Sequence, residues 1–260
     1  MRTTIKLLLL YFAYQLLAGA VMAGAGHLWA VPVTTQLACS LLLSGLAMTV
    51  HLVAGGYVSL RHSLRPVGVT PMLCSVACVM AAVLGCNALG ALLTLPNWLE
   101  ADFDALSHHV LGIAGMALMA PWVEELLFRG AIMHRLHSQG LTPWRSIVVS
   151  ALVFGLIHIN PAQVFFAFLI GIPLGWVTVC TRSLWPAITA HALNNSLSVV
   201  EIVTAGDEGP AIDLAALPYQ DLLVIILIGL ATSIMLGRKL PHLVELYKEQ
   251  TIKPNNIKEK

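Results

Sequence analysis

The sequence predicts an all-α fold, a polytopic transmembrane bundle of about eight helices. Of its 260 residues, 58% are hydrophobic and only 10% are charged, whereas soluble domains carry about 25% charged residues. Apolar runs long enough to cross a bilayer recur along the chain. The bundle is expected to form a single transmembrane domain over 1–240, followed by a polar tail at 241–260.

The first apolar run follows Arg2 and Lys6 and ends in VMAGAG. This arrangement resembles a signal peptide with a small-residue exit. The run is about 20 residues long, however, which is enough to span a membrane. It is therefore predicted as an uncleaved first helix.

Seven further helices are predicted from the remaining apolar runs. The fifth is short because it lies between Pro143 and Pro161. The expected ranges are 36–60, 72–95, 109–136, 146–159, 163–180, 184–203 and 221–236.

Charge placement supports this count and gives an orientation. If the N-terminus is inside, every Lys and Arg except Arg129 falls in an inner segment, and the outer connections carry Asp and Glu instead. Basic residues concentrate on the cytoplasmic side of membrane proteins, so both termini are predicted to be cytoplasmic. The compact chain favours a bacterial inner membrane. Its Lys-rich tail is expected to touch anionic lipid.

Several features exclude other classes of function. The net charge is +1 and there is no nucleic-acid motif, so nucleic acid is not an expected partner. The five cysteines lie in apolar stretches and are interpreted as small hydrophobic residues rather than a disulfide framework. GIPLG at 171–175 predicts close packing of the sixth helix against a neighbour.

The predicted fourth helix contains PWVEELLFRG at 121–130, which places three ionisable groups among hydrocarbon side chains. Each costs about 2.5–3.5 kcal/mol at the centre of a bilayer, so such groups indicate a functional site. Glu125 and Arg129 are four residues apart and can pair on one helical face. Glu124 is then left to face a different partner.

Two later helices carry further polar side chains. FGLIH at 154–158 contains His158, and HALNN at 191–195 contains His191 and Asn195 four residues apart. Counted from the basic residues at the inner helix ends, these groups and Glu124 lie at similar depths, roughly 14–20 Å from that side at 1.5 Å per residue. They are therefore expected to meet around one pocket.

This combination of groups favours hydrolysis. Glu124 can act as a general base toward a water that His158 also holds, while His191 and Asn195 can donate hydrogen bonds to a developing oxyanion. Alternatively, Glu124, His158 and His191 are a reasonable ligand set for one divalent metal such as zinc. The residues alone do not decide between these two ways of activating water.

The ordered motifs resemble those of the CPBP family of CAAX proteases and bacteriocin-processing enzymes, also called the Abi family. Its patterns EExxxR, FxxxH and HxxxN/B match 121–198, within a motif-bearing core at about 109–203. The resemblance implies a CAAX-protease-like intramembrane endopeptidase whose cavity opens to the cytosolic leaflet. It implies that Glu124 and His158 activate water and that His191 and Asn195 complete the site. Supporting motif members are Glu125, Arg129 and Phe154.

The function expected from these features is cleavage of a peptide or membrane-protein substrate near the cytoplasmic side of the lipid bilayer. Peptide or bacteriocin maturation and CAAX-type processing are both compatible with it. Two alternatives from other classes stay open, a non-enzymatic membrane immunity or scaffold protein and a proton- or metal-coupled transporter, because Glu and His within a membrane also form proton relays.

Overall fold

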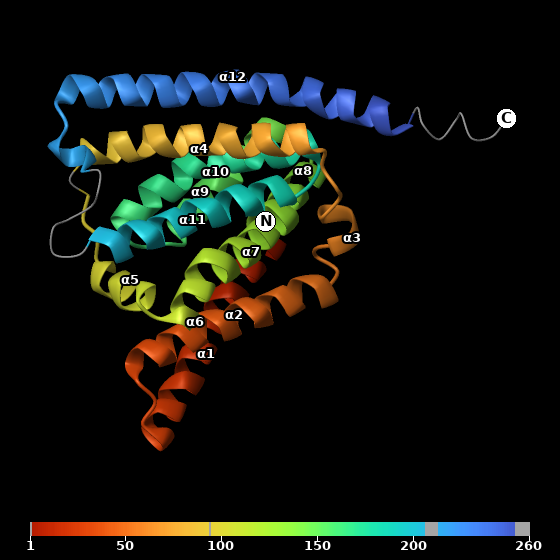
Figure 1. Cartoon of the computed structure of the whole chain (residues 1–260). Coiled ribbons are helices and arrows are strands. Elements are labelled where there is room, and N and C mark those ends of the chain that lie inside the picture. Colours follow the sequence, from red (N-terminus) through yellow and green to blue (C-terminus); the bar gives the residue numbers. More distant parts are fainter. Residues whose placement is uncertain (1, 94, 206–212, 253–260) are drawn as a thin grey trace.

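The computed structural model describes residues 2–93, 95–205 and 213–252, and within these ranges it contains helices and no strands (Figure 1). One of the predicted outer connections contains Asp207 and Glu208, which lie outside the described residues. The end of the predicted tail, at 253–260, lies outside them as well. The predicted all-α class is confirmed.

Within the described residues, eight long helical stretches lie close to the places that the apolar runs predicted. Seven of them are α1 (Arg2–Trp29), α2 (Val33–Ala54), α4 (Val69–Ala91), α9 (Pro143–Leu156), α10 (Pro161–Thr181), α11 (Trp185–Ala205) and α12 (Tyr219–Ile252). The fourth in order is continuous but changes its winding, through α6 (Val110–Ile113), η1 (Ala114–Met119), α7 (Ala120–Glu125), η2 (Leu126–Met133) and α8 (His134–Ser138). Short connecting helices are α3 (Leu60–Ser63), α5 (Glu100–Ser107) and η4 (Leu214–Ala216).

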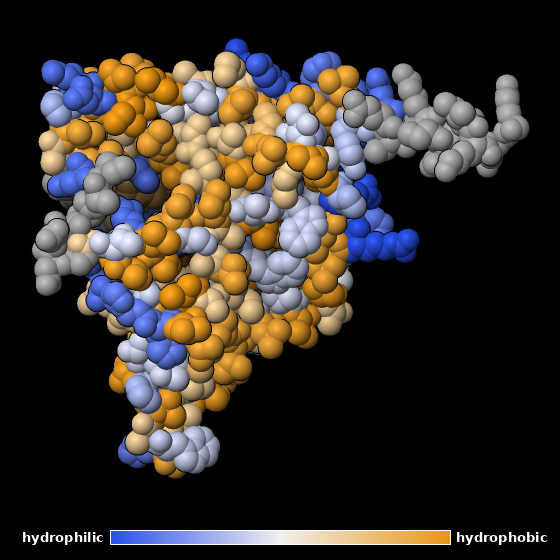
Figure 2. Space-filling model, in the orientation of Figure 1, coloured by the Kyte–Doolittle hydropathy of each residue, from blue (hydrophilic) through white to orange (hydrophobic). Residues whose placement is uncertain are grey.

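Six of these stretches within the described residues are long and apolar enough to cross a membrane. The two others are α9, which has 14 residues, and α11, which has 21 residues but carries His191, Asn194, Asn195 and Glu201. Figure 2 shows hydrophobic residues over most of the visible face. Lipid is the solvent that such a surface requires, so the chain is an integral membrane protein.

The helices form pairs around the central fourth stretch. In Figure 1, α1 and α2 form a hairpin that projects from one side, and α12 lies along α4 on the opposite side. Gly229 permits the close approach of α12 to α4, since a Cβ there would lie 2.7 Å from the Ala81 carbonyl oxygen and 2.8 Å from the Gly85 nitrogen. Helix α12 then continues through Pro241, and Val244 is still buried against the core.

Helix α10 packs closely on α9, as the GIPLG motif predicted. A Cβ on Gly171 would lie 2.8 Å from the Cβ of Ala151, and one on Gly175 would lie 2.9 Å from Ile147. The absence of side chains at these two positions is what lets the backbones approach. This packing also brings the Gly171 carbonyl to the buried site.

The fifth helix ends earlier than predicted, at Leu156 instead of residue 159. Pro161 disfavours helical geometry in the residue before it, and it begins α10 as that helix's first residue. Between the two helices, Ile159 takes a left-handed conformation with φ of 62°, which is strained for a β-branched side chain. His158 therefore lies in a tight turn at the end of α9 and not on a continuous helix.

Candidate active site

Both motif carboxylates lie on α7, a six-residue α-helical segment with π-helical turns on either side. Pi-helical turns inside α-helices are rare and occur frequently at functional sites. Glu124 and Glu125 are both buried, with 7% and 0% of their surface exposed. Consecutive side chains on a helix diverge by roughly 100°, so the two carboxylates have different partners.

Glu125 is held in a buried network that includes the predicted ion pair. Its Oε1 accepts a hydrogen bond from Arg129 Nη1 at 2.8 Å and another from His191 Nδ1 at 2.9 Å. The second Arg129 nitrogen, Nη2, donates to the Gly171 carbonyl at 3.1 Å, and the guanidinium lies over the Phe154 ring at 4.5 Å. Glu125 is thus neutralised, and the same oxygen fixes the orientation of His191.

Glu124 has looser contacts and faces the other nitrogen of the same imidazole. Its Oε2 lies 3.8 Å from His191 Nε2, which is too long for a hydrogen bond. A polar gap of this length can be bridged by a water or a substrate group. Its Oε1 accepts a hydrogen bond from the Tyr11 hydroxyl at 3.4 Å.

His158 approaches the same region through Phe154. Its Nδ1 bonds the Phe154 carbonyl oxygen at 2.8 Å, and since a carbonyl can only accept, Nδ1 carries the proton. The Phe154 ring lies edge-on to both imidazoles, with centroid distances of 5.0 Å to His158 and 5.8 Å to His191. Phe154 therefore spaces the two rings, and Nε2 of His158 is the nitrogen left for substrate or water.

The turn that carries His158 is anchored by its neighbour. Asn160 is 1% exposed, donates to Asn97 Oδ1 at 2.8 Å and accepts from the Trp98 backbone N–H at 3.0 Å. These bonds tie the strained α9–α10 turn to the segment before α5. The position of His158 thus depends on residues outside the three motifs.

Asn195 bonds one backbone group and one neighbouring side chain. Its Nδ2 donates to the Met116 carbonyl at 3.0 Å, which joins α11 to η1, and its Oδ1 accepts from Asn194 at 3.1 Å. One amide proton is therefore committed to Met116. Asn195 holds the helix that presents His191, and its second amide proton is the one available to a ligand.

The suggested metal set is not assembled by these side chains. No group of three or more His, Cys, Asp and Glu residues in the described ranges is arranged to hold a metal ion. Glu124 faces His191, and the Phe154 ring contacts the imidazoles of both His191 and His158. The five cysteines are free thiols, and Cys74 and Cys78 donate to carbonyls of α12.

Tyr11 is the site residue that the sequence did not reveal. It lies on α1, 113 residues before Glu124, and is 8% exposed. A tyrosine buried within an apolar helix usually has a hydrogen-bond partner for its hydroxyl. That is the one signal in the sequence that could have marked it.

The fold and these contacts define a polytopic helical membrane protein with a buried glutamate–histidine site that water-sized groups can bridge. Residues 106–197 match the family model described as "Type II CAAX prenyl endopeptidase Rce1-like". The recognition of the CPBP family from its motifs is thereby confirmed. The matched family is a protease family, which supports peptidase activity in this chain. Comparison with curated proteins gives no match, and comparison with solved structures gives none either.

Proposed function

We propose that this protein is an intramembrane endopeptidase that hydrolyses a peptide bond with a water activated by Glu124. The observation that carries the proposal is that the two adjacent carboxylates have different partners. Glu125 is bound by Arg129 and His191, whereas Glu124 faces a 3.8 Å gap to His191 Nε2. A general base must keep an oxygen free for the proton that it removes, within reach of water. Oε2 of Glu124 meets this condition at the gap, whereas Oε2 of Glu125, which also has no hydrogen-bond partner among the described residues, belongs to a side chain with no exposed surface.

In the proposed reaction, Glu124 removes a proton from water, and the resulting hydroxide attacks the carbonyl carbon of the scissile bond. His158 Nε2 holds the same water from the end of α9. His191, oriented by Glu125, stabilises the charge on the carbonyl oxygen through Nε2–H when its ring is protonated, and the free amide proton of Asn195 assists. Glu124 then returns its proton to the leaving nitrogen as the C–N bond breaks. Tyr11 orients the Glu124 carboxylate.

The matched family's description suggests a prenylated CAAX-type C-terminus as one class of substrate. Maturation of a peptide or bacteriocin is the other class compatible with the CPBP motifs. The lipid bilayer and a peptide or membrane-protein segment are the partners in either case. A bacterial inner membrane with both termini in the cytoplasm is the proposed location.

The test is cleavage by the purified full-length chain in detergent, with a prenylated CAAX peptide and a library of unmodified peptides as substrates. Glu124→Gln should abolish cleavage, while Glu201→Gln, which removes the same charge from an exposed position on α11, should not. Cleavage should also survive dialysis against a chelator, because no step uses a metal. Full activity of Glu124→Gln would refute the proposal, and loss of activity that zinc restores would refute the proposed activation of water.

The same variants separate the two alternatives. A scaffold or immunity protein would show no cleavage and would keep its phenotype in Glu124→Gln. A proton-coupled transporter would instead show uptake into liposomes that depends on Glu124, without proteolysis.

A further inference from the structure

A second polar region lies one to three helical turns from the active site, at the end of the helices where arginines gather. It is a cavity of about 910 Å³, and none of the proposed catalytic residues lines it. Its walls come from α1, from the α2–α3 connection together with α3 and the residues just after it, from η2 with α8, from the start of α9, and from the end of α10 with the α10–α11 turn. The Ser183 hydroxyl donates to the Arg65 carbonyl at 2.8 Å and the Leu184 N–H donates to the Ser63 carbonyl at 2.7 Å, so two of these walls are hydrogen-bonded together.

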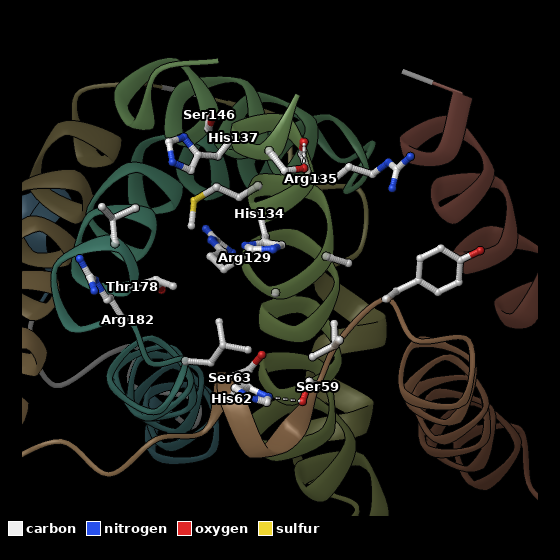
Figure 3. A pocket seen from close by; sticks show the side chains of 18 of the residues that line it. Ser59, His62, Ser63, Arg129, His134, Arg135, His137, Ser146, Thr178 and Arg182 are labelled. Atoms are coloured by element: carbon white, nitrogen blue, oxygen red, sulfur yellow. Dashed lines mark hydrogen bonds between the residues drawn. The ribbon is translucent and has the colours of Figure 1, made fainter. Parts of the chain in front are cut away.

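The lining carries positive charge without compensation. Arg65, Arg135 and Arg182 line the cavity together with three histidines, and none of the described lining residues is Asp or Glu. Within the described part of the chain, none of these three arginines forms an ion pair. Figure 3 shows Arg129 and His134 toward the middle of the cavity, with Arg182, Arg135 and His62 around its edge. Arg129 is already bound to Glu125, so the free charges are those of the edge.

The backbone at Arg182 reinforces this arrangement. Arg182 ends α10 in the left-handed conformation, with φ of 54°, and its N–H bonds the Thr178 carbonyl at 2.8 Å. Glycine or asparagine is the usual residue at such a position. An arginine there costs conformational energy, and its long cationic side chain is placed at the cavity edge as a result.

The chemistry of the walls restricts the ligand. The arginines supply planar donors suited to phosphate oxygens, and Leu7, Val58, Met133 and Val179 supply apolar contacts in the same cavity. A ligand that satisfies both is anionic at one end and apolar beside it. Basic pockets between transmembrane helices at the membrane surface bind lipid headgroups. The volume is within the range of small-molecule sites, about 300–1,000 Å³.

We propose that this cavity binds the phosphate of an anionic phospholipid from the leaflet on the arginine-rich side. The positive charges of Arg65, Arg135 and Arg182 around the cavity edge attract the lipid phosphate, and its glycerol and first acyl carbons lie against the apolar lining residues. This inference does not rest on proteolysis, so it can fail or hold independently of the proposed function.

The experiment measures lipid binding by the full chain purified in a non-ionic detergent. Phosphatidylglycerol, phosphatidylcholine and inorganic phosphate are titrated separately, and the readouts are the thermal-unfolding midpoint and lipid retention in native mass spectrometry. Phosphatidylglycerol should raise the midpoint and stay bound, unlike phosphatidylcholine. Arg65→Gln, Arg135→Gln and Arg182→Gln should each weaken it about fivefold, the factor expected for about 1 kcal/mol per arginine near a membrane surface.

Matched controls separate a site from general surface charge. Arg61→Gln and Arg238→Gln remove the same charge from exposed residues that do not line the cavity, and they should leave lipid affinity unchanged. Equal weakening by these controls would overturn the proposal, as would binding of phosphatidylcholine with the same affinity. Inorganic phosphate that binds as tightly, with the same arginine dependence, would assign the cavity to free phosphate and overturn the lipid assignment. The lipid assignment would also be overturned if a peptide with a free C-terminal carboxylate bound here, while the same peptide with a C-terminal amide and phosphatidylglycerol did not bind.

Discussion

Replacing Glu125 with Gln should destabilise the fold, whereas replacing Glu124 with Gln should remove activity and leave stability nearly unchanged. The two residues are adjacent and the substitutions are chemically identical, so each serves as the control for the other. Glu125 is fully buried and is the ion-pair partner of the equally buried Arg129. Removing one partner of a buried pair costs about 3–5 kcal/mol, because the other charge is left uncompensated.

The corresponding cost at Glu124 is much smaller. Among the described residues, Glu124 accepts a hydrogen bond from Tyr11 that is 3.4 Å long, and an ordinary hydrogen bond contributes about 0.5–1.5 kcal/mol. In a protein of this size 1 kcal/mol corresponds to about 2–4 °C in the unfolding midpoint. Glu125→Gln should therefore lower the midpoint by about 6–20 °C and Glu124→Gln by a few degrees at most.

The assay is thermal unfolding of the purified chain in one detergent, beside peptide cleavage on the same samples. The double variant Glu125→Gln/Arg129→Met provides the control, because it removes the uncompensated charge as well as its partner. It should be less destabilised than the sum of the two single variants. Additive losses in the double variant, or equal losses for Glu124→Gln and Glu125→Gln, would refute the assignment of the buried ion pair to Glu125.

Three further substitutions test other parts of the site. Tyr11→Phe should lower kcat/KM about tenfold, which is equivalent to about 1.4 kcal/mol for a hydrogen bond to a carboxylate. The control Tyr14→Phe on the same helix should leave kcat/KM unchanged. Equal effects of the two variants in the cleavage assay would remove Tyr11 from the site. Gly171→Ala should lower the free energy of unfolding by about 1–3 kcal/mol, because the added methyl group overpacks against α9. Gly19→Ala should be neutral or slightly stabilising, because a Cβ at Gly19 meets nothing within 4 Å. A neutral effect of Gly171→Ala would contradict the close packing. Asn160→Ala should lower the free energy of unfolding by about 1–3 kcal/mol and should also slow cleavage, because two hydrogen bonds of Asn160 fix its turn. Normal cleavage kinetics of this variant would show that His158 is positioned in another way.

The sequence was most informative where membrane burial restricts what a residue can do. An isolated charge in hydrocarbon is costly, so Glu125 and Arg129 could be paired from their spacing alone, and the pair is present at 2.8 Å. The small residues of GIPLG likewise indicated close packing before any neighbour was known. In both cases a local pattern has few physically acceptable partners.

Contacts between distant segments were much less predictable. Nothing in the local sequence of α1 states that Tyr11 will reach Glu124, because that contact depends on how the α1–α2 hairpin docks. The winding of the fourth helical stretch was also unpredictable, since the π-helical turns on both sides of α7 have no strong sequence signature. The end of α9 was partly readable, because Pro161 limits the helix. The left-handed conformation of Ile159, which turns the chain after His158, could not be predicted from the sequence.

In the proposed reaction the geometry gives each of the two adjacent glutamates a separate role. Glu125 bonds Nδ1 of His191, so the ring has one orientation and Nε2 must point toward Glu124. Without that bond the imidazole could rotate, and the gap between Nε2 and Glu124 would no longer have a fixed width. Arg129 in turn pairs with Glu125 and is itself fixed by the Gly171 carbonyl and the Phe154 ring. In the proposed reaction the buried ion pair therefore helps to position the reactive groups, and a substitution anywhere along it should change the orientation of His191 before it changes the chemistry of Glu124.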